Sequence, residues 1–232
     1  MGKILSRIIS QANMFVTKGA LVIDDNDKLS LAQIIITQLL RGKYNREFSK
    51  EVYQATFPQL VHEAENQIGS FSTEQLTKIY SLLYNENALK EISMGVVLNP
   101  KRLEEYSYTL CNRIFIFYRI DGDMEFVTSD NPVMFLNTET HNVQPFTNGM
   151  LNEKVLIYYP ISPKILLCAY PKLLYSALLP HNDCLLSFTV KTNKDYINFI
   201  NYKQMEQSYN QVYAHRSQEL DKYSITINDR NS

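Results

Sequence analysis

The first half of the chain repeats its apolar residues at the spacing of amphipathic helices. This pattern predicts a first helix over residues 3–18, ended by Gly19, and a second helix over 29–42. The second helix is the more apolar of the two, so we expect it near the centre of the fold. A third helical stretch covers residues 49–68, and Pro58 is expected to break or kink it.

The clearest local signal begins a further helix over residues 73–91. Ser72 and Gln75 have the spacing of a capping box, in which each side chain bonds the backbone N–H of the other residue. Phe71 and Leu76 have the spacing of a hydrophobic staple across the same turn. The sequence therefore fixes the start of this helix better than that of any other element.

After residue 107 the pattern changes to short runs of β-branched and aromatic residues, which favour strands. Asp121-Gly122 predicts a hairpin turn between the first two strands, and Ser162-Pro163 lies between the fourth and fifth. A last helix is predicted over 193–214, with Thr192 or Asn193 as its N-cap. The expected strands are 108–120, 124–129, 133–137, 154–161, 164–171, 185–190 and an edge strand at 223–227.

Together these elements predict an α+β fold in one domain over residues 1–232. Its helical N-terminal half, 1–95, packs on a mainly antiparallel sheet formed by 105–190. A long C-terminal helix over 192–216 closes the structure. The succession of helices followed by strands is typical of this class.

Composition places the chain among ordinary globular proteins, with 45% hydrophobic and 20% charged residues. No stretch reaches the roughly 18 apolar residues of a membrane span. The net charge of −1 does not indicate nucleic acid as a partner, although a local basic patch stays open. Three widely spaced cysteines in apolar stretches predict buried, reduced thiols and therefore a cytoplasmic protein.

Familiar catalytic and metal-binding motifs are absent, and the scattered histidines and cysteines lack metal-ligand spacing. No metal ligand is therefore predicted, and the cofactor is unknown. One segment, FVTSDNPV over 126–133, places hydroxyl, carboxylate and amide groups at the end of a strand. There Asp130 is a candidate general base or metal ligand. The alternative is a turn before Pro132, stabilised by the Asp130 and Asn131 side chains.

The predicted helix over 29–42 carries a second candidate pair. Gln38 and Arg41 are three residues apart and therefore share a face of that helix. Arginine is the preferred partner of carboxylates and phosphates. The pair either belongs to the solvated face of the helix or points into a polar cleft.

Several segments resemble the bacterial family called domain of unknown function 4238. The resemblance rests on the Gln38/Arg41 helix, on FVTSDNPV, on YYPISPKILL at 158–167, and on Asn201 to Tyr213 in the last helix. FVTSDNPV is the most specific of these segments. The matching segments occur in the family's order and span most of the chain.

The resemblance implies an uncharacterised protein that acts as an anti-phage defence effector with nuclease or other hydrolase activity. In that hypothesis Asp130, Arg41 and Gln38 are catalytic, and Ser129, Asn131 and Asn201 bind substrate. Family members usually carry an additional N-terminal segment before the first helix, and this chain starts directly at that helix. Either a protein partner supplies the segment, or it was lost or cut away. The alternative hypothesis is a non-catalytic binding or regulatory subunit that needs this protein partner.

Overall fold

The computed structural model describes residues 2–14, 18–22, 24–82, 85–97, 99–143, 149–173, 185–191, 193–217 and 220. The helices are α1 (Gly2–Met14), α2 (Asp25–Arg41), α3 (Lys43–Ile68), α4 (Thr73–Ser81), α5 (Glu86–Val97), α6 (Pro100–Cys111) and α7 (Lys194–Glu206). The strands are β1 (Lys18–Val22), β2 (Arg113–Ile120), β3 (Thr128–Ser129), β4 (Met134–Asn137), β5 (Val155–Ser162), β6 (Ile165–Pro171), β7 (Leu185–Lys191) and β8 (Val212–Tyr213). This content confirms the predicted α+β class.

The main sheet has six strands in the order β1-β7-β2-β6-β5-β4. Strands β2 and β7 pair in parallel, and the other neighbours are antiparallel. The predicted hairpin around Ser162-Pro163 is confirmed by the β5–β6 pair. A separate two-stranded sheet joins β3 to β8.

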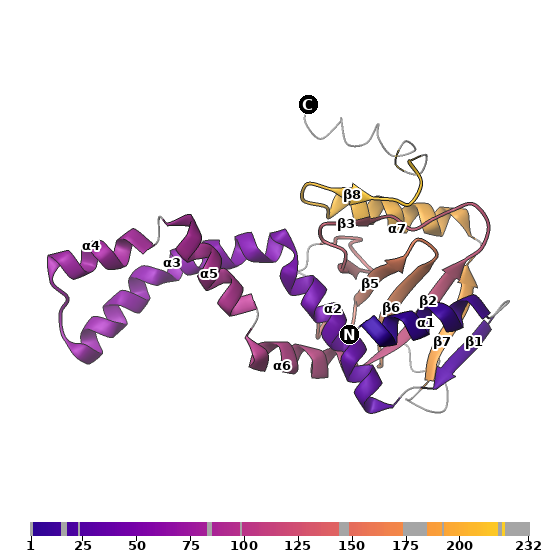
Figure 1. Cartoon of the computed structure of the whole chain (residues 1–232), viewed down its shortest axis with the longest axis horizontal. Coiled ribbons are helices and arrows are strands. Elements are labelled where there is room, and N and C mark those ends of the chain that lie inside the picture. The colour runs from indigo at the N-terminus through magenta and orange to yellow at the C-terminus, as the bar shows by residue number, and fades with distance from the viewer. Residues whose placement is uncertain are drawn as a thin grey trace.

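Helices cover both faces of this sheet (Figure 1). One apolar core joins β2 residues such as Phe117 to Ile8 of α1, Leu31 and Ile35 of α2, and Leu110 of α6. The other core joins the alternate residues of the same strands, such as Ile116, to Ile197 and Ile200 of α7. Because both faces are buried, the strands are continuously apolar rather than alternating with polar residues.

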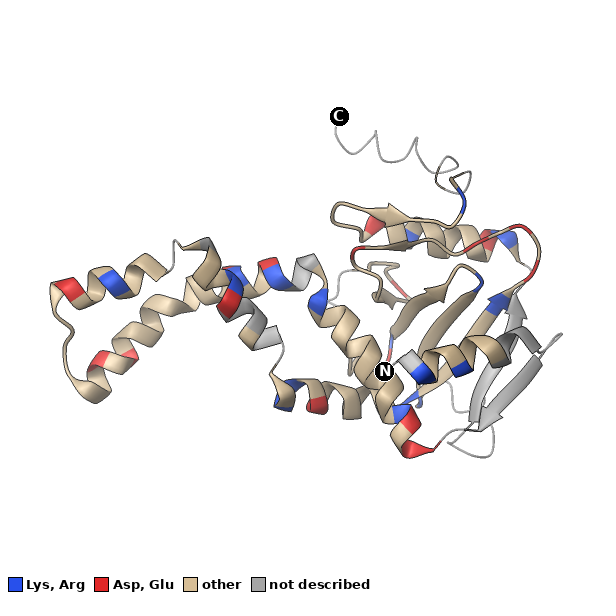
Figure 2. Cartoon of the chain, viewed as in Figure 1, with Lys and Arg blue, Asp and Glu red and all other residues tan. Residues whose placement is uncertain are grey.

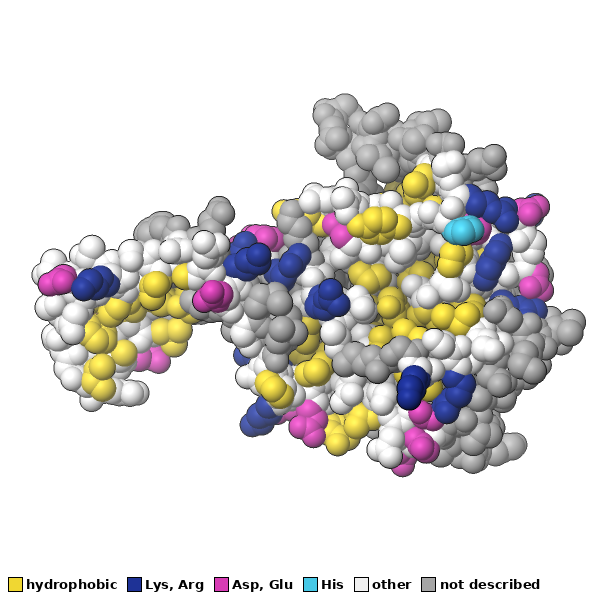
Figure 3. All heavy atoms as spheres, in the orientation of Figure 1, with side chains coloured by type: hydrophobic (Ala, Val, Ile, Leu, Met, Phe, Trp, Pro, Cys, Tyr) yellow, Lys and Arg dark blue, Asp and Glu magenta, His cyan; other side chains and the backbone are white. Residues whose placement is uncertain are grey.

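Helices α3, α4 and α5 project from the sheet body as an arm, which is seen at the left of Figure 1. Phe57 and Val61 of α3 are buried within the arm, against side chains of α4 and its flanking residues. Figure 3 shows hydrophobic side chains along the visible face of the arm. Phe48, Val52 and Leu60 of α3 are exposed large hydrophobic residues. The arm therefore has a small core of its own and leaves apolar surface in solvent.

Two predictions about helices need correction. Helix α3 runs unbroken from Lys43 to Ile68 with Pro58 inside it. The predicted helix over 73–91 is two helices, α4 and α5. The capping box of Ser72 and Gln75 at the start of α4 is confirmed by both of its hydrogen bonds.

The first predicted hairpin is also wrong. Residues 108–111 close helix α6, so β2 begins only at Arg113. Gly122 forms a turn with φ 82°, but β2 then pairs with β6 and β7, and β3 pairs with β8. Strand β1 was not predicted.

The C-terminal part follows the prediction only in outline. The last helix ends at Glu206, and its N-cap is Asn193 rather than Thr192. Cys168 is buried and Cys111 half-buried, both as free thiols. Cys184 and the expected edge strand at 223–227 lie outside the described residues. None of the described helices combines the length and apolar character needed to cross a bilayer.

Candidate functional site

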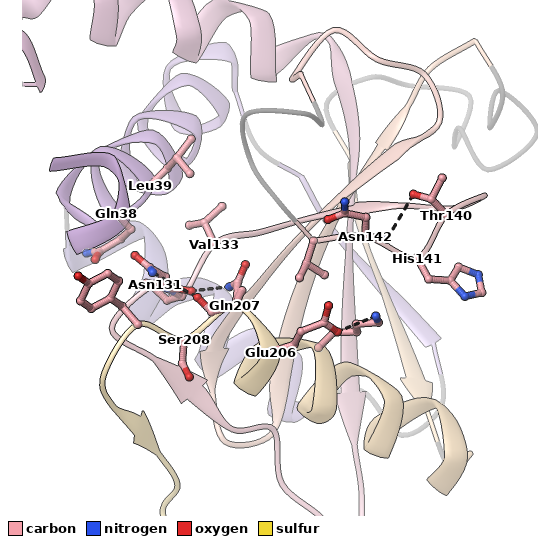
Figure 4. A pocket seen from close by; sticks show the side chains of 14 residues that line it. Gln38, Leu39, Asn131, Val133, Thr140, His141, Asn142, Glu206, Gln207 and Ser208 are labelled. Carbon is pink, nitrogen blue, oxygen red and sulfur yellow. Dashed lines mark hydrogen bonds and ion pairs between the residues drawn. The ribbon is translucent and has the colours of Figure 1, made fainter. Parts of the chain in front are cut away.

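A cavity of about 540 Å³ opens where the end of α2 meets the end of α7. Its walls come from the last turn of α2, from the SDNP loop (residues 129–132), from the loop after β4, and from the residues that end α7. Figure 4 shows the side chains of these segments around the cavity. Elements that are distant in the sequence therefore build it jointly.

The SDNP loop is held in place by buried hydrogen bonds to α7. The Ser129 hydroxyl accepts the backbone N–H of Asn131 at 3.1 Å and the side-chain amide of Gln204 at 2.6 Å. Gln204 also donates to the Asn131 carbonyl at 2.9 Å. Because Ser129 and Gln204 are buried, losing either partner would leave an unsatisfied polar group.

Asp130 stabilises the turn that follows α7. One carboxylate oxygen accepts the backbone N–H of Tyr209 at 3.0 Å, and the other accepts that of Asn210 at 2.9 Å. The Asp130 N–H donates to the Gln211 carbonyl at 3.1 Å, which continues into the β3–β8 pair. The carboxylate thus orders the chain beside the cavity. The turn that it bonds is the one after α7, whereas the sequence alternative placed its side chain in the turn before Pro132.

Asn131 joins α7 to the end of α2. Its side-chain amide donates to the Gln207 backbone carbonyl at 3.3 Å, and its backbone carbonyl accepts a hydrogen bond from the Gln207 side-chain amide. On its other side, the Oδ1 atom lies against Gly42 so closely that a Cβ at Gly42 would overlap it. The SDNP loop and the Gln38/Arg41 helix therefore meet directly.

The two candidate residues on α2 differ in position. Gln38 is half-buried and lines the cavity, and Figure 4 draws it beside Asn131. Arg41 is exposed and is not among the lining residues. The structure therefore brings Gln38 and Asn131 to one cavity, with Asp130 supporting its wall and Arg41 outside it.

Asn201 is fully buried and lies away from the cavity lining. Its side-chain oxygen accepts the Val127 N–H at 3.0 Å, and its amide donates to the Glu125 carbonyl at 2.8 Å. This arrangement fastens α7 to the segment that leads into the SDNP loop. The amide of Asn201 is thereby committed to backbone groups.

Sequence reasoning missed several cavity residues. Lys203 and Glu206 are the charged members of the lining, and they pair with each other at 2.7 Å. Gln207 contributes a half-buried amide. A signal was present, because Asn201, Gln204 and Gln207 recur every three residues and so share a face of α7.

The described residues contain no group of three His, Cys, Asp or Glu side chains placed to hold a metal ion. Over the same residues, Figure 2 shows basic and acidic residues interspersed along the helices. Burial raises the pKa of Tyr158 in the sheet, which is not a lining residue of the cavity. Because Lys203 and Glu206 in the lining offset each other's charge, the cavity is a polar site of small net charge.

The comparisons with known proteins give one match. A family model described as a protein of unknown function (DUF4238) matches residues 1–218. No curated protein matches the chain, and no solved structure matches it. The match covers all of the elements that form the cavity.

Proposed function

Since the chain belongs to the DUF4238 family, which is itself of unknown function, we propose a function from the geometry of the cavity. The protein binds a small polar ligand between the end of α2, the SDNP loop and the end of α7. It acts as a binding or regulatory protein through this site. The proposal places the protein in the cytoplasm, where its reduced thiols persist.

The observation that carries the proposal is the convergence of Gln38, Asn131 and Gln207 on one cavity. They come from three separate segments of the chain. The volume of about 540 Å³ lies within the range of small-molecule sites. The Gln38 side chain makes no hydrogen bond within the described chain, so both its NH₂ donor and its oxygen acceptor can serve a ligand.

A matched pair of variants on α2 tests this proposal. Gln38→Leu removes the amide that borders the cavity, whereas Gln33→Leu makes the same change away from its lining. The full chain is screened against small polar metabolites by thermal shift, and hits are measured by calorimetry. We expect Gln38→Leu alone to weaken binding. Equal effects of the two variants, or the absence of any ligand, would contradict the proposal.

A second candidate function is an anti-phage defence effector with nuclease or another hydrolase activity, as the family resemblance implies. The contact between Gly42 and Asn131 favours it, because it brings the Gln38/Arg41 helix to the SDNP loop. In this mechanism Asp130 acts as a base or metal ligand and Arg41 holds an anion. Ser129 and Asn131 would position the substrate, and Asn201 would act indirectly, by holding the backbone that leads into the SDNP loop.

The test of the effector function is a cellular one. Asp130→Asn and Arg41→Ala are expressed at normal levels, and toxicity or phage defence is measured. Loss of activity in both variants, with unchanged thermal stability, would support catalysis. Full activity in both would exclude it. The two backbone N–H groups that occupy Asp130 favour the binding function over this one.

The regulatory form of the proposal includes a protein partner. Exposed apolar residues of the arm, such as Val52 and Leu60, would suit such an interface, since large apolar surface in solvent is typical of interaction sites. Sedimentation of the full chain, alone and with proteins co-purified from its native host, measures whether it forms a complex with a protein partner. A monodisperse monomer with no co-purifying protein would count against a partner.

A further inference from the structure

We infer that the ligand of the cavity is a nucleobase or its uncharged nucleoside. This inference rests on the proposed ligand-binding function and specifies its chemistry. Three properties of the lining lead to it: side-chain amides along one edge, no excess charge, and apolar walls. Each property excludes a different class of ligand.

The amides supply paired donors and acceptors. Gln38 lines the cavity, and its side-chain oxygen and NH₂ group make no hydrogen bond within the described chain. The Gln207 side-chain nitrogen donates to the Asn131 backbone carbonyl and to the Gln204 side-chain oxygen at 3.4 Å, which leaves the Gln207 side-chain oxygen as an acceptor. Figure 4 draws Gln38, Asn131 and Gln207 along one edge of the cavity. Adjacent donors and acceptors match the edge of a base, which glutamine and asparagine bind in a bidentate manner.

The charge of the lining argues against a polyphosphate. Apart from His141, Lys203 is the basic residue of the lining, and it pairs with Glu206 at 2.7 Å. A di- or triphosphate normally needs several basic groups or a metal ion. Among the described residues no metal-holding group exists, and Arg41 lies outside the lining. An uncharged ligand fits this balance best.

The apolar part of the lining fits the faces of a planar ring. Leu39 and Val133 lie beside the amides, with Pro132 and Val143 close by in the same lining. A heterocyclic base has two apolar faces and a polar edge, so it can use both parts of the wall together. A base with its ribose also suits a cavity of about 540 Å³.

Calorimetry on the full chain tests the inference with adenosine, guanosine, cytidine and uridine, with their free bases, and with the matching triphosphates. We expect at least one nucleoside to bind, and its triphosphate to bind no more tightly. Gln38→Leu should weaken that binding about ten- to a hundredfold, while Gln33→Leu should not change it. Circular dichroism and the thermal midpoint show whether both variants are folded.

A parallel set of polar metabolites that contain no nucleobase tests the nucleobase inference separately from the proposed ligand-binding function. If one of these binds in a Gln38-dependent way and no nucleoside does, the nucleobase inference fails and the ligand-binding function survives. If nothing in either set binds, both fail. Tighter binding of triphosphates than of nucleosides would also overturn the inference, since it would show that the site recognises phosphate.

Discussion

Gly42 and Asn131 are in such close contact that any side chain at position 42 would overlap the Asn131 Oδ1 atom. Gly42 is the junction between α2 and α3, and Asn131 belongs to the SDNP loop. The φ angle of Gly42 is −54°, so the backbone conformation does not require glycine at this position. Space alone explains this residue, and the contact ties the base of the arm to the wall of the cavity.

We therefore predict that Gly42→Ala destabilises the protein by about 1–3 kcal/mol, because the added methyl group forces Asn131 or the end of α2 to move. Denaturant unfolding measures this, and a shift in the amide NMR signals of the SDNP loop should accompany it. The effect should also reach ligand binding, since Asn131 borders the cavity.

Gly95→Ala is the matched control for this substitution. Gly95 lies within α5, and a Cβ there would meet nothing within 4 Å. Alanine at this position should stabilise the helix by about 1 kcal/mol. In the double variant Gly42→Ala/Asn131→Ala, part of the loss should be recovered. A loss that is equal with and without Asn131 would refute the proposed contact.

A second prediction concerns Asp130. Asp130→Ala removes two charge-assisted hydrogen bonds to the turn after α7 and should cost about 2–3 kcal/mol in the free energy of unfolding. Asp130→Asn keeps one acceptor oxygen and should cost less. Asp123→Ala is the control, since the Asp123 side chain is fully solvated and its ion pair with Arg216 lies at the surface.

The same measurement separates the two interpretations of this carboxylate. A structural role predicts that stability falls in the order wild type, Asp130→Asn, Asp130→Ala. A catalytic role predicts lost activity with unchanged stability. Unchanged stability in both variants would mean that the hydrogen bonds to Tyr209 and Asn210 contribute nothing, contrary to the structure.

Short-range signals in the sequence were the ones that predicted structure well. The Ser72/Gln75 capping box and the hairpin around Ser162-Pro163 are both encoded within a few residues. The strand at 108–120 failed at its start because β-branched and aromatic residues at its N-terminal end belong to α6. The Asn99 cap and Pro100 at the first helical position were the local signals that could have corrected it.

Pairing between strands could not be predicted locally. Asp121-Gly122 does form a turn, but β2 lies between β6 and β7, so no place beside it remains for residues 124–129. Strand neighbours of this kind depend on which apolar faces are buried together. That choice is made by α2, α6 and α7 packing on the two faces of the sheet.

The candidate site was predicted in part for a similar reason. FVTSDNPV is one contiguous motif, so its importance was visible from the sequence alone. Gln204 and Gln207 lie more than seventy positions away, and only the fold brings them to Asn131. Gln38 was found through its spacing to Arg41, although the two residues then have different surroundings.

A third prediction concerns Arg113, which is buried at the start of β2. Its guanidinium donates to the carbonyls of Met150, Asn152 and Val155, the last at 2.5 Å. Arg113→Met would leave these acceptors unsatisfied, so we expect a loss of about 3 kcal/mol in unfolding experiments. Arg102→Met, at an exposed position of α6, should change stability by less than about 0.5 kcal/mol. Equal losses would contradict this role.

The last prediction concerns alkaline pH and a tyrosine cluster formed by Tyr158 and Tyr170 of the sheet with Tyr196 of α7. Burial raises the pKa of Tyr158, Tyr170 and Tyr196 above the usual value near 10. Above that value the unfolded chain loses these protons while the folded chain keeps them, so folding stability must fall as pH rises. Burial lowers the pKa of Arg113 to about 10, which acts in the opposite direction, but through a single group.

Tyrosinate absorbance is a clean measure of this effect, because the chain has no tryptophan. Exposed tyrosines should titrate first, and the buried ones should ionise only together with the loss of circular dichroism. Tyr170→Phe removes one of the raised pKa values and should make stability less dependent on pH above about 10. Titration of all tyrosines in one step before unfolding would show that the cluster is not buried as described.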